Sequence, residues 1–130
     1  MSSETNMSYL AGVIDCDGSI FMAKNYSCEI RISNTRVGLL RKIQQIIKEE
    51  FGIIKRIEES KNNPRGKLWR KGYLIRITKR KYVKQILLEL IKFLTIKSSQ
   101  AYLILLFIDK TIGKKHCYEE LKELNRKGIK

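Results

Sequence analysis

The sequence has few residues that break or cross-link a chain. Its 130 residues include one proline, eight glycines and three cysteines. So few prolines and glycines argue against a fibrous or loop-rich protein. The cysteines show no pairing pattern, and one would be left over, so we expect reduced thiols. The densest apolar run, Ala101 to Ile108, has eight residues, far short of the roughly 18 that a membrane span needs.

Acidic residues are scarce, and a secretory signal is not visible. Lys plus Arg is 27 and Asp plus Glu is 13, which gives a net charge of +14. With 43% hydrophobic residues, the chain is not a disordered basic tail, and residues 1–130 are expected to form one domain. Such a domain most often meets a polyanion rather than a membrane. The start, MSSETNMSYLAG, has no basic region before an apolar stretch. We therefore expect the protein to work where it is made, in an organelle matrix or a prokaryotic cytoplasm.

Several kinds of catalytic chemistry lack their residues. The single histidine, His116, lies beside Cys117, but no Cys-x-x-Cys occurs, so a metal site of soft ligands is not expected. One histidine in a polar stretch gives little support for a Ser-His-Asp hydrolase. No glycine-rich phosphate loop of the Walker type is present. What remains is an acid pair, because two of only three aspartates, Asp15 and Asp17, lie two residues apart.

Apolar periodicity predicts nine elements in the order α-β-β-α-β-β-α-α-α. Two hairpins, each followed by a helix, predict an α+β fold with one mixed or antiparallel four-stranded sheet and helices on one face. An Asn34-Thr35 cap is expected before the second helix, and deep burial is expected for the helix after Ser98 or Ser99. The expected helices cover 7–15, 37–51, 79–94, a stretch from 98 or 99, and 118–126; the expected strands cover 19–24, 27–33, 53–60 and 68–78.

The first predicted helix has one face with little bulk. Ser8, Gly12 and Cys16 are four residues apart, with Ala11 and Asp15 alongside. Residues with this spacing share a helix face, and small side chains let another backbone come close. The pattern favours tight helix–helix packing. A short core helix with incidental small residues is the alternative.

The predicted sheet has a charged face. In the second strand Cys28, Ile30 and Ile32 alternate with Glu29, Arg31 and Ser33, and the later strands contribute Arg56, Glu58, Arg70 and Arg76. Arginine mixed with polar residues along a β-ribbon is typical of base recognition in a major groove. Lys61, Arg65 and Lys67, in the predicted turn before the fourth strand, are expected to bind phosphates. An ordinary solvated sheet face is the alternative.

The acid pair falls at the end of the first predicted helix. The helix dipole is negative there, so an aspartate costs about 0.3–1 kcal/mol that a bound cation would offset. An Asp oxygen together with a helix-end carbonyl, that of Cys16, suits Mg²⁺. In a basic DNA-binding protein, such a site suggests metal-assisted phosphodiester hydrolysis. Asp15 is also interpretable as a capping residue, and Asp17 as a turn residue before Gly18.

The string LAGVIDCDG, residues 10 to 18, resembles the signature of the LAGLIDADG homing endonucleases at seven of nine positions. Val13 and Cys16 are the two departures. Ser33-Asn34-Thr35 and the segment FLTIKSSQA, residues 93–101, also resemble family members at the right distances. The similarity therefore extends over nearly the whole chain.

The resemblance implies an αββαββα fold whose saddle-shaped sheet lies in the major groove, with extra C-terminal helices. It implies that Asp17 binds Mg²⁺, or another divalent cation such as Mn²⁺, beside the backbone carbonyl of Cys16. Lys97 matches a basic residue near the cleavage site. Asn34 matches a polar residue, often Gln, that positions water, and Asn is shorter by one methylene.

Because the chain has one signature, the resemblance implies a homodimer on a near-palindromic site. The dimer interface is predicted at Ser8, Ala11, Gly12 and Asp15. Strand parity, taken with the family fold, predicts the residues that face DNA. They are Phe21, Ala23, Glu29, Arg31, Ser33, Arg56, Glu58, Arg70 and Arg76, with Lys61, Arg65 and Lys67 beside them.

Three functions follow from these patterns. The first is a site-specific endonuclease that cuts both DNA strands with Mg²⁺. The second is a DNA-binding protein without cleavage, or a maturase that binds intron RNA, on the same fold. The third, a structural ribosomal or chromatin protein, explains the charge but leaves the acid pair unexplained. Asp17 and Lys97 favour the enzyme.

Overall fold

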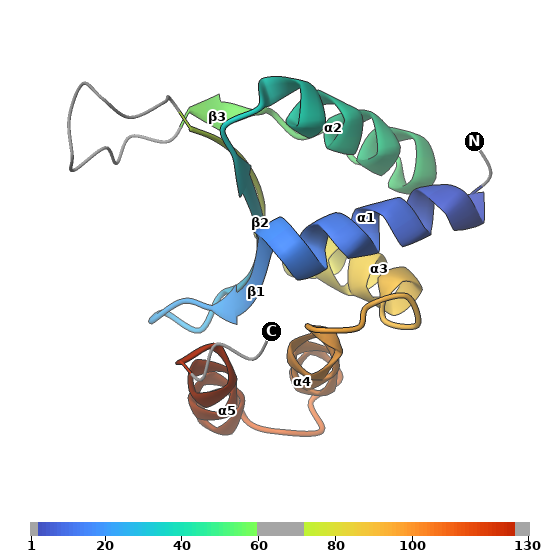
Figure 1. The fold of residues 1–130 in the computed structure, drawn as a ribbon. Helices are drawn as coiled ribbons and strands as arrows, with labels where there is room; N and C mark the ends of the chain where they lie inside the picture. Colours follow the sequence, from blue (N-terminus) through green and yellow to red (C-terminus); the bar gives the residue numbers. More distant parts are fainter. Residues whose placement is uncertain (1–2, 60–71, 127–130) are drawn as a thin grey trace.

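The computed structural model describes residues 3–59 and 72–126 and has the predicted order of elements (Figure 1). The four strands form one antiparallel sheet in the order β1-β2-β4-β3. The α+β fold is therefore confirmed. The elements are α1 Ser3–Asp17, β1 Gly18–Met22, β2 Cys28–Asn34, α2 Val37–Phe51, β3 Glu58–Glu59, β4 Tyr73–Ile77, α3 Arg80–Leu90, α4 Ser98–Ile108 and α5 Lys114–Arg126.

One face of the sheet is covered by α1, α2 and α3, and the core lies between them (Figure 1). The register aligns Ile20 with Ile30 and Ile30 with Ile77, so these isoleucines point to the same side. All three are fully buried. The alternation of apolar and polar residues in the strands predicted this burial correctly, because successive side chains of a strand point to opposite faces of the sheet.

The second helix, α2, has both predicted boundaries, Val37 and Phe51, but not the predicted N-cap. Gly52 ends it in the left-handed region, at φ 69°, and its N–H donates to the Lys48 carbonyl at 2.9 Å, a common helix stop. At the start, the predicted Asn34-Thr35 cap is wrong, because Arg36 is the N-cap and no side chain caps the helix. The Asn34 Oδ1 instead accepts the Arg36 N–H at 2.8 Å.

The first helix begins earlier than predicted, at Ser3. Its first turn is bound to α2, since Ser3 Oγ donates to Glu50 Oε1 at 2.6 Å and Asn6 Nδ2 donates to Glu50 Oε2 at 2.8 Å. These hydrogen bonds, that from Ser3 first, lower the pKa of the Glu50 carboxyl. A contact 44 residues away along the chain leaves no trace in local periodicity, so the sequence pattern placed the start of the helix too late.

The third strand is shorter than predicted and covers only Glu58–Glu59. Residues 53–57 were expected to belong to it but lie outside the sheet. Gln44 of α2 donates from Nε2 to the Lys55 carbonyl at 2.7 Å, which binds this segment to the helix instead. Likewise α3 ends at Leu90 rather than Leu94.

The two C-terminal helices also differ from expectation. The α4 helix was predicted to be deeply buried, yet Tyr102 is 57% exposed and only Gln100, Ala101, Ile104 and Leu105 are buried. The α5 helix begins at Lys114, four residues before the predicted start. It lies beside the edge strand β1, where Asn125 Nδ2 donates to the Ile20 carbonyl at 3.3 Å. An edge strand covered in this way is protected from pairing with other chains.

The three thiols have different environments, and we expect them to react differently. Cys16 is exposed, whereas Cys28 and Cys117 are buried, and burial raises the pKa of each buried thiol to about 11. Since the thiolate is the reactive form, a raised pKa means almost no reaction at pH 8. Iodoacetamide, followed by mass spectrometry, should modify Cys16 alone in the folded protein and all three cysteines in urea. Equal native rates for the three thiols would contradict the buried positions.

In the described parts of the chain, no helix is both long and apolar enough to cross a membrane.

Candidate active site and sheet surface

Asp17 is the last residue of α1, and its side chain is exposed. Gly18 follows and immediately starts β1. A Cβ atom on Gly18 would lie 2.9 Å from both the Cα and the carbonyl oxygen of Ile14 and 3.3 Å from the Arg31 carbonyl oxygen. Only glycine therefore lets the strand leave the helix this closely. The abrupt turn holds the Asp17 carboxylate where the helix meets the sheet.

Asn34, at the end of β2, holds the Asp17 carboxylate. Its Nδ2 donates to Asp17 Oδ2 at 3.1 Å, while its Oδ1 accepts the Arg36 N–H. Because both ends of the Asn34 amide are engaged, its orientation is fixed. The structure therefore brings together two of the residues singled out by the sequence, 17 positions apart.

Asp15 is buried and binds the segment that precedes α4. Its Oδ2 accepts the Thr95 N–H at 2.8 Å, and its Oδ1 accepts those of Ile96 at 3.1 Å and Lys97 at 2.9 Å. The capping interpretation of Asp15 agrees with this geometry, although the capped groups belong to a segment 80 residues away. Its carboxylate is therefore engaged within its own chain.

Lys97 is held at the same helix end. Its Nζ donates to the backbone carbonyl of Asp15 at 2.7 Å, and a cation is favourable there because the end of a helix is negative. An ammonium group has three donors, so two remain for other acceptors. Asp15 and Lys97 thus join α1 to the start of α4 and bring Lys97 to the helix that ends in Asp17. The sequence pattern did not predict this connection.

We expect Asp15→Ala to destabilise the fold. The change leaves three backbone N–H groups without an acceptor, and the expected loss is about 2–3 kcal/mol in the free energy of unfolding. Urea denaturation would measure it. Asp109→Ala is the matched control, because the Asp109 side chain is exposed and, among the described residues, contacts only the surface lysine Lys84, at 3.3 Å. Equal losses in the two variants would contradict the anchoring contacts of Asp15.

The donor set at the end of α1 fits a hard divalent cation only in part. The Asp17 carboxylate and the carbonyl of Cys16 are oxygen ligands of the kind that Mg²⁺ prefers. Within residues 3–59 and 72–126, however, no group of three or more His, Cys, Asp or Glu side chains could hold a metal ion. A cation here would need ligands beyond those of the described residues, such as a nucleic-acid phosphate, water or a second copy.

The strand register places the predicted DNA-facing residues on the side of the sheet opposite the core. Phe21 aligns with Glu29, Arg31 with Arg76, and Ser33 with Leu74. Glu58 also aligns with Leu74 and so shares this face. Parity in the strands predicted this side correctly, but it omitted Ser19, opposite Arg31, and Leu74.

Other residues of the predicted surface lie around the sheet or cannot be placed. Ala23 lies just beyond β1, where its N–H donates to the Ser27 carbonyl at 2.8 Å in the hairpin turn. Arg56 is exposed and precedes β3. Lys61, Arg65, Lys67 and Arg70 lie outside the described residues.

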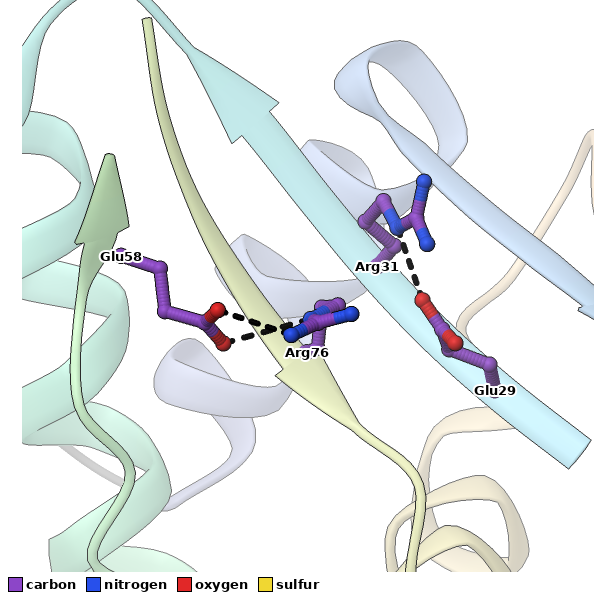
Figure 2. Close-up of polar contacts among 4 residues, drawn as sticks. All are labelled: Glu29, Arg31, Glu58 and Arg76. Atoms are coloured by element: carbon purple, nitrogen blue, oxygen red, sulfur yellow. Dashed lines mark hydrogen bonds and ion pairs between the residues drawn. The ribbon is translucent and has the colours of Figure 1, made fainter. Parts of the chain in front are cut away.

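Charge on this surface is more balanced than the sequence suggested. Arg31 Nε lies 2.7 Å from Glu29 Oε2, and Arg76 Nη2 lies 2.8 Å from Glu58 Oε1 (Figure 2). The hydrogen bond from Arg76 lowers the pKa of the Glu58 carboxyl. Both arginines in the described strands are therefore paired with a glutamate of the same face.

The small-residue face of α1 divides in two. Ser8, Gly12 and Cys16 are exposed, whereas Ala11 and Asp15 are buried against their own chain. A Cβ atom on Gly12 would meet nothing within 4 Å. The described residues of the chain therefore do not require a glycine at position 12.

Comparison with known proteins agrees with this architecture. A sequence profile described as a LAGLIDADG-like domain matches residues 4–91. Among curated protein sequences, none matches this chain.

Three solved structures show the same fold at low sequence identity. The homing endonuclease I-CvuI, in complex with the I-CreI target, is 18% identical, with a TM-score of 0.70 over 94% of this chain and 83% of its own. The homing endonuclease I-TnaI is 14% identical, with a TM-score of 0.53 over 98% and 97%. The meganuclease I-SmaMI, bound to DNA, is 18% identical, with a TM-score of 0.55 over 95% of this chain but 43% of its own.

The profile covers more than half of the chain and includes the signature, α1 and the whole sheet. The chain belongs to the LAGLIDADG homing endonuclease family, as a member with a single signature.

Proposed function

We propose that this protein is a site-specific DNA endonuclease that acts as a homodimer and requires a divalent cation, Mg²⁺ or Mn²⁺. The observation that carries the proposal is the meeting of Asp17, Asn34 and Lys97 around the end of α1. In a protein that only bound DNA, an exposed carboxylate at Asp17 would be unfavourable, because the carboxylate repels DNA phosphates.

Each of these residues has a chemical role in the proposal. Asp17 and the carbonyl of Cys16 would hold the cation. When bound, the cation supplies charge stabilisation at the phosphate and lowers the pKa of a coordinated water. Asn34 positions the Asp17 carboxylate through its 3.1 Å hydrogen bond. Lys97 has two ammonium N–H donors left for a phosphate oxygen at the site of cleavage.

Double-stranded DNA is the proposed substrate, and the face of Arg31 and Arg76 is the surface that binds it. A β-ribbon of this kind enters a major groove and reads base edges. The structures of I-CvuI and I-SmaMI are complexes with DNA. This sheet has the same fold as theirs, which supports the same use.

The proposal needs two copies because one chain has one signature and one exposed end-of-helix aspartate. Both DNA strands must be cut, and a twofold dimer places an Asp17 from each subunit at its centre. The chain matches 43% of the I-SmaMI chain, as one half of a larger enzyme would. Of the residues predicted at the dimer interface, Ser8 and Gly12 are exposed on α1, and they form the proposed contact between copies.

Cleavage of a randomised duplex DNA library tests the proposal. The protein is incubated with the library and Mg²⁺, in parallel with EDTA, and the cut ends are sequenced. The expected result is a pair of cuts within one near-palindromic sequence, present only with Mg²⁺. Recovery of a bound sequence without cuts would refute the nuclease and favour a DNA-binding protein. Preferential binding of RNA over DNA would favour a maturase.

A further inference from the structure

The DNA-facing side of the sheet contains two glutamates that the proposed DNA binding leaves unexplained. Glu29 and Glu58 lie on this face by register, where a carboxylate repels DNA phosphates. Stability does not account for Glu58, since a partly exposed ion pair contributes only about 0–1 kcal/mol. Each glutamate binds one arginine of the same face (Figure 2).

The contacts of Arg76 engage one edge of its guanidinium group. Arg76 donates from Nε to Glu58 Oε2 at 3.2 Å and from Nη2 to Glu58 Oε1 at 2.8 Å. A guanidinium has five N–H donors arranged in a plane. Because Glu58 occupies the Nε–Nη2 edge, the opposite end of the guanidinium stays free to donate. At that end, Nη1 and Nη2 each present one N–H. Two parallel donors of this kind match the O6 and N7 acceptors of guanine.

Arg31 is held differently but with the same result. Its Nε donates to Glu29 Oε2 at 2.7 Å, and its guanidinium carbon lies 5.2 Å from the centre of the Phe21 ring. Both Nη groups remain outside the contact with Glu29. The Glu29 side chain is only 9% exposed, whereas the side chain of Arg31 is 39% exposed. The carboxylate therefore lies beneath the arginine, which is the outer partner of the pair.

From this geometry we infer that Glu29 and Glu58 are positioning residues that orient Arg31 and Arg76 to read two guanines in each half-site of the DNA target. The inference rests on the proposed function and adds to it the base that each arginine selects. Arg31 and Arg76 are direct cross-strand partners, about 5 Å apart at their Cα atoms. A base-pair step rises about 3.4 Å, so the two guanines lie within one or two steps of each other.

The test measures base preference with Glu58→Gln. Wild-type protein and the variant are each bound to a pool of duplexes randomised at single positions of the selected target, and bound sequences are counted. We expect the variant to lose about tenfold in preference for guanine at one position and to keep its preferences elsewhere. Glu29→Gln should do the same at the position read by Arg31.

Two controls separate positioning from other effects. Glu89→Gln makes the same charge change on an exposed residue of α3, a helix on the opposite face of the sheet, and should alter no base preference. Arg76→Ala removes the reader, so adding Glu58→Gln in that background should change nothing further. Thermal unfolding confirms that each variant is folded.

The outcomes distinguish this inference from the proposed function. If Glu58→Gln changes preference equally with and without Arg76, Glu58 reads a base itself and the inference is overturned. An unchanged guanine preference in both Glu29→Gln and Glu58→Gln also overturns it, with DNA binding intact. If the wild-type protein selects no sequence at all, the proposed function fails and the inference fails with it.

Discussion

Replacing Asp17 with asparagine is expected to abolish cleavage while target binding is retained. Asparagine has the same size and keeps an oxygen that can accept an N–H from Asn34. In the unmutated protein, Asn34 Nδ2 lies 3.1 Å from Asp17 Oδ2. It loses the negative charge that would hold a divalent cation. Since a catalytic metal contributes several kcal/mol and each 1.36 kcal/mol is a factor of ten, the cleavage rate should fall by about a thousandfold or more.

The measurement is single-turnover cleavage of the selected target, with affinity measured separately in Ca²⁺. Asp109→Asn is the matched control, because it makes the same substitution at an exposed residue at the end of another helix, α4. The control should cut at the wild-type rate. Cleavage by Asp17→Asn at the wild-type rate would mean that the cation is not bound at the end of α1. Equal loss of binding and cutting would mean that Asp17 serves binding rather than chemistry.

The helices and strands of this fold were predictable from the sequence where their apolar residues recur at regular spacing and pack against the core. Apolar and polar residues alternate in β2, and in β4 apart from Leu74, while α2 repeats its apolar residues at helical spacing. Burial of Ile32, Ile75 and Ile43 follows from these patterns. The first predicted helix ended at Asp15, and the structure continues it by two residues to Asp17, directly before Gly18.

Long-range polar contacts were not predictable in this way. The spacing of residues gives no sign that Asp15 binds the amides of residues 95–97, or that Glu50 holds the first turn of α1. Strand parity placed Glu29 and Glu58 beside the arginines on one face but could not show that each carboxylate is engaged by one of them. Such contacts depend on which segments meet in three dimensions, and local periodicity does not contain that information.

The second large effect is expected from Gly12→Leu, which should separate the proposed dimer. In the single chain, a Cβ atom at this position meets nothing within 4 Å, and a glycine inside a helix costs about 0.5–1 kcal/mol relative to alanine. The isolated subunit should therefore fold at least as well with leucine. Between two close-packed helices, the same side chain would separate the backbones by several ångströms.

Sedimentation at micromolar concentration would measure the assembly, and cleavage of the selected target would measure activity. Gly38→Leu is the matched control, since Gly38 is also exposed in a helix and its Cβ would likewise meet nothing within 4 Å. We expect the control to stay dimeric and active, and Gly12→Leu to be a folded monomer that cuts at least a hundredfold more slowly.

Gly12 costs stability in one chain, whereas close packing of two chains requires it. If wild-type protein sediments as a monomer, or if Gly12→Leu remains dimeric and active, the contact between copies does not involve this face of α1. Loss of dimer and of cleavage together, with the fold intact, would show that one Asp17 is insufficient. The lack of a cluster of three or more metal-ligating side chains among the described residues would then be explained, because the second copy would supply the other half of the site.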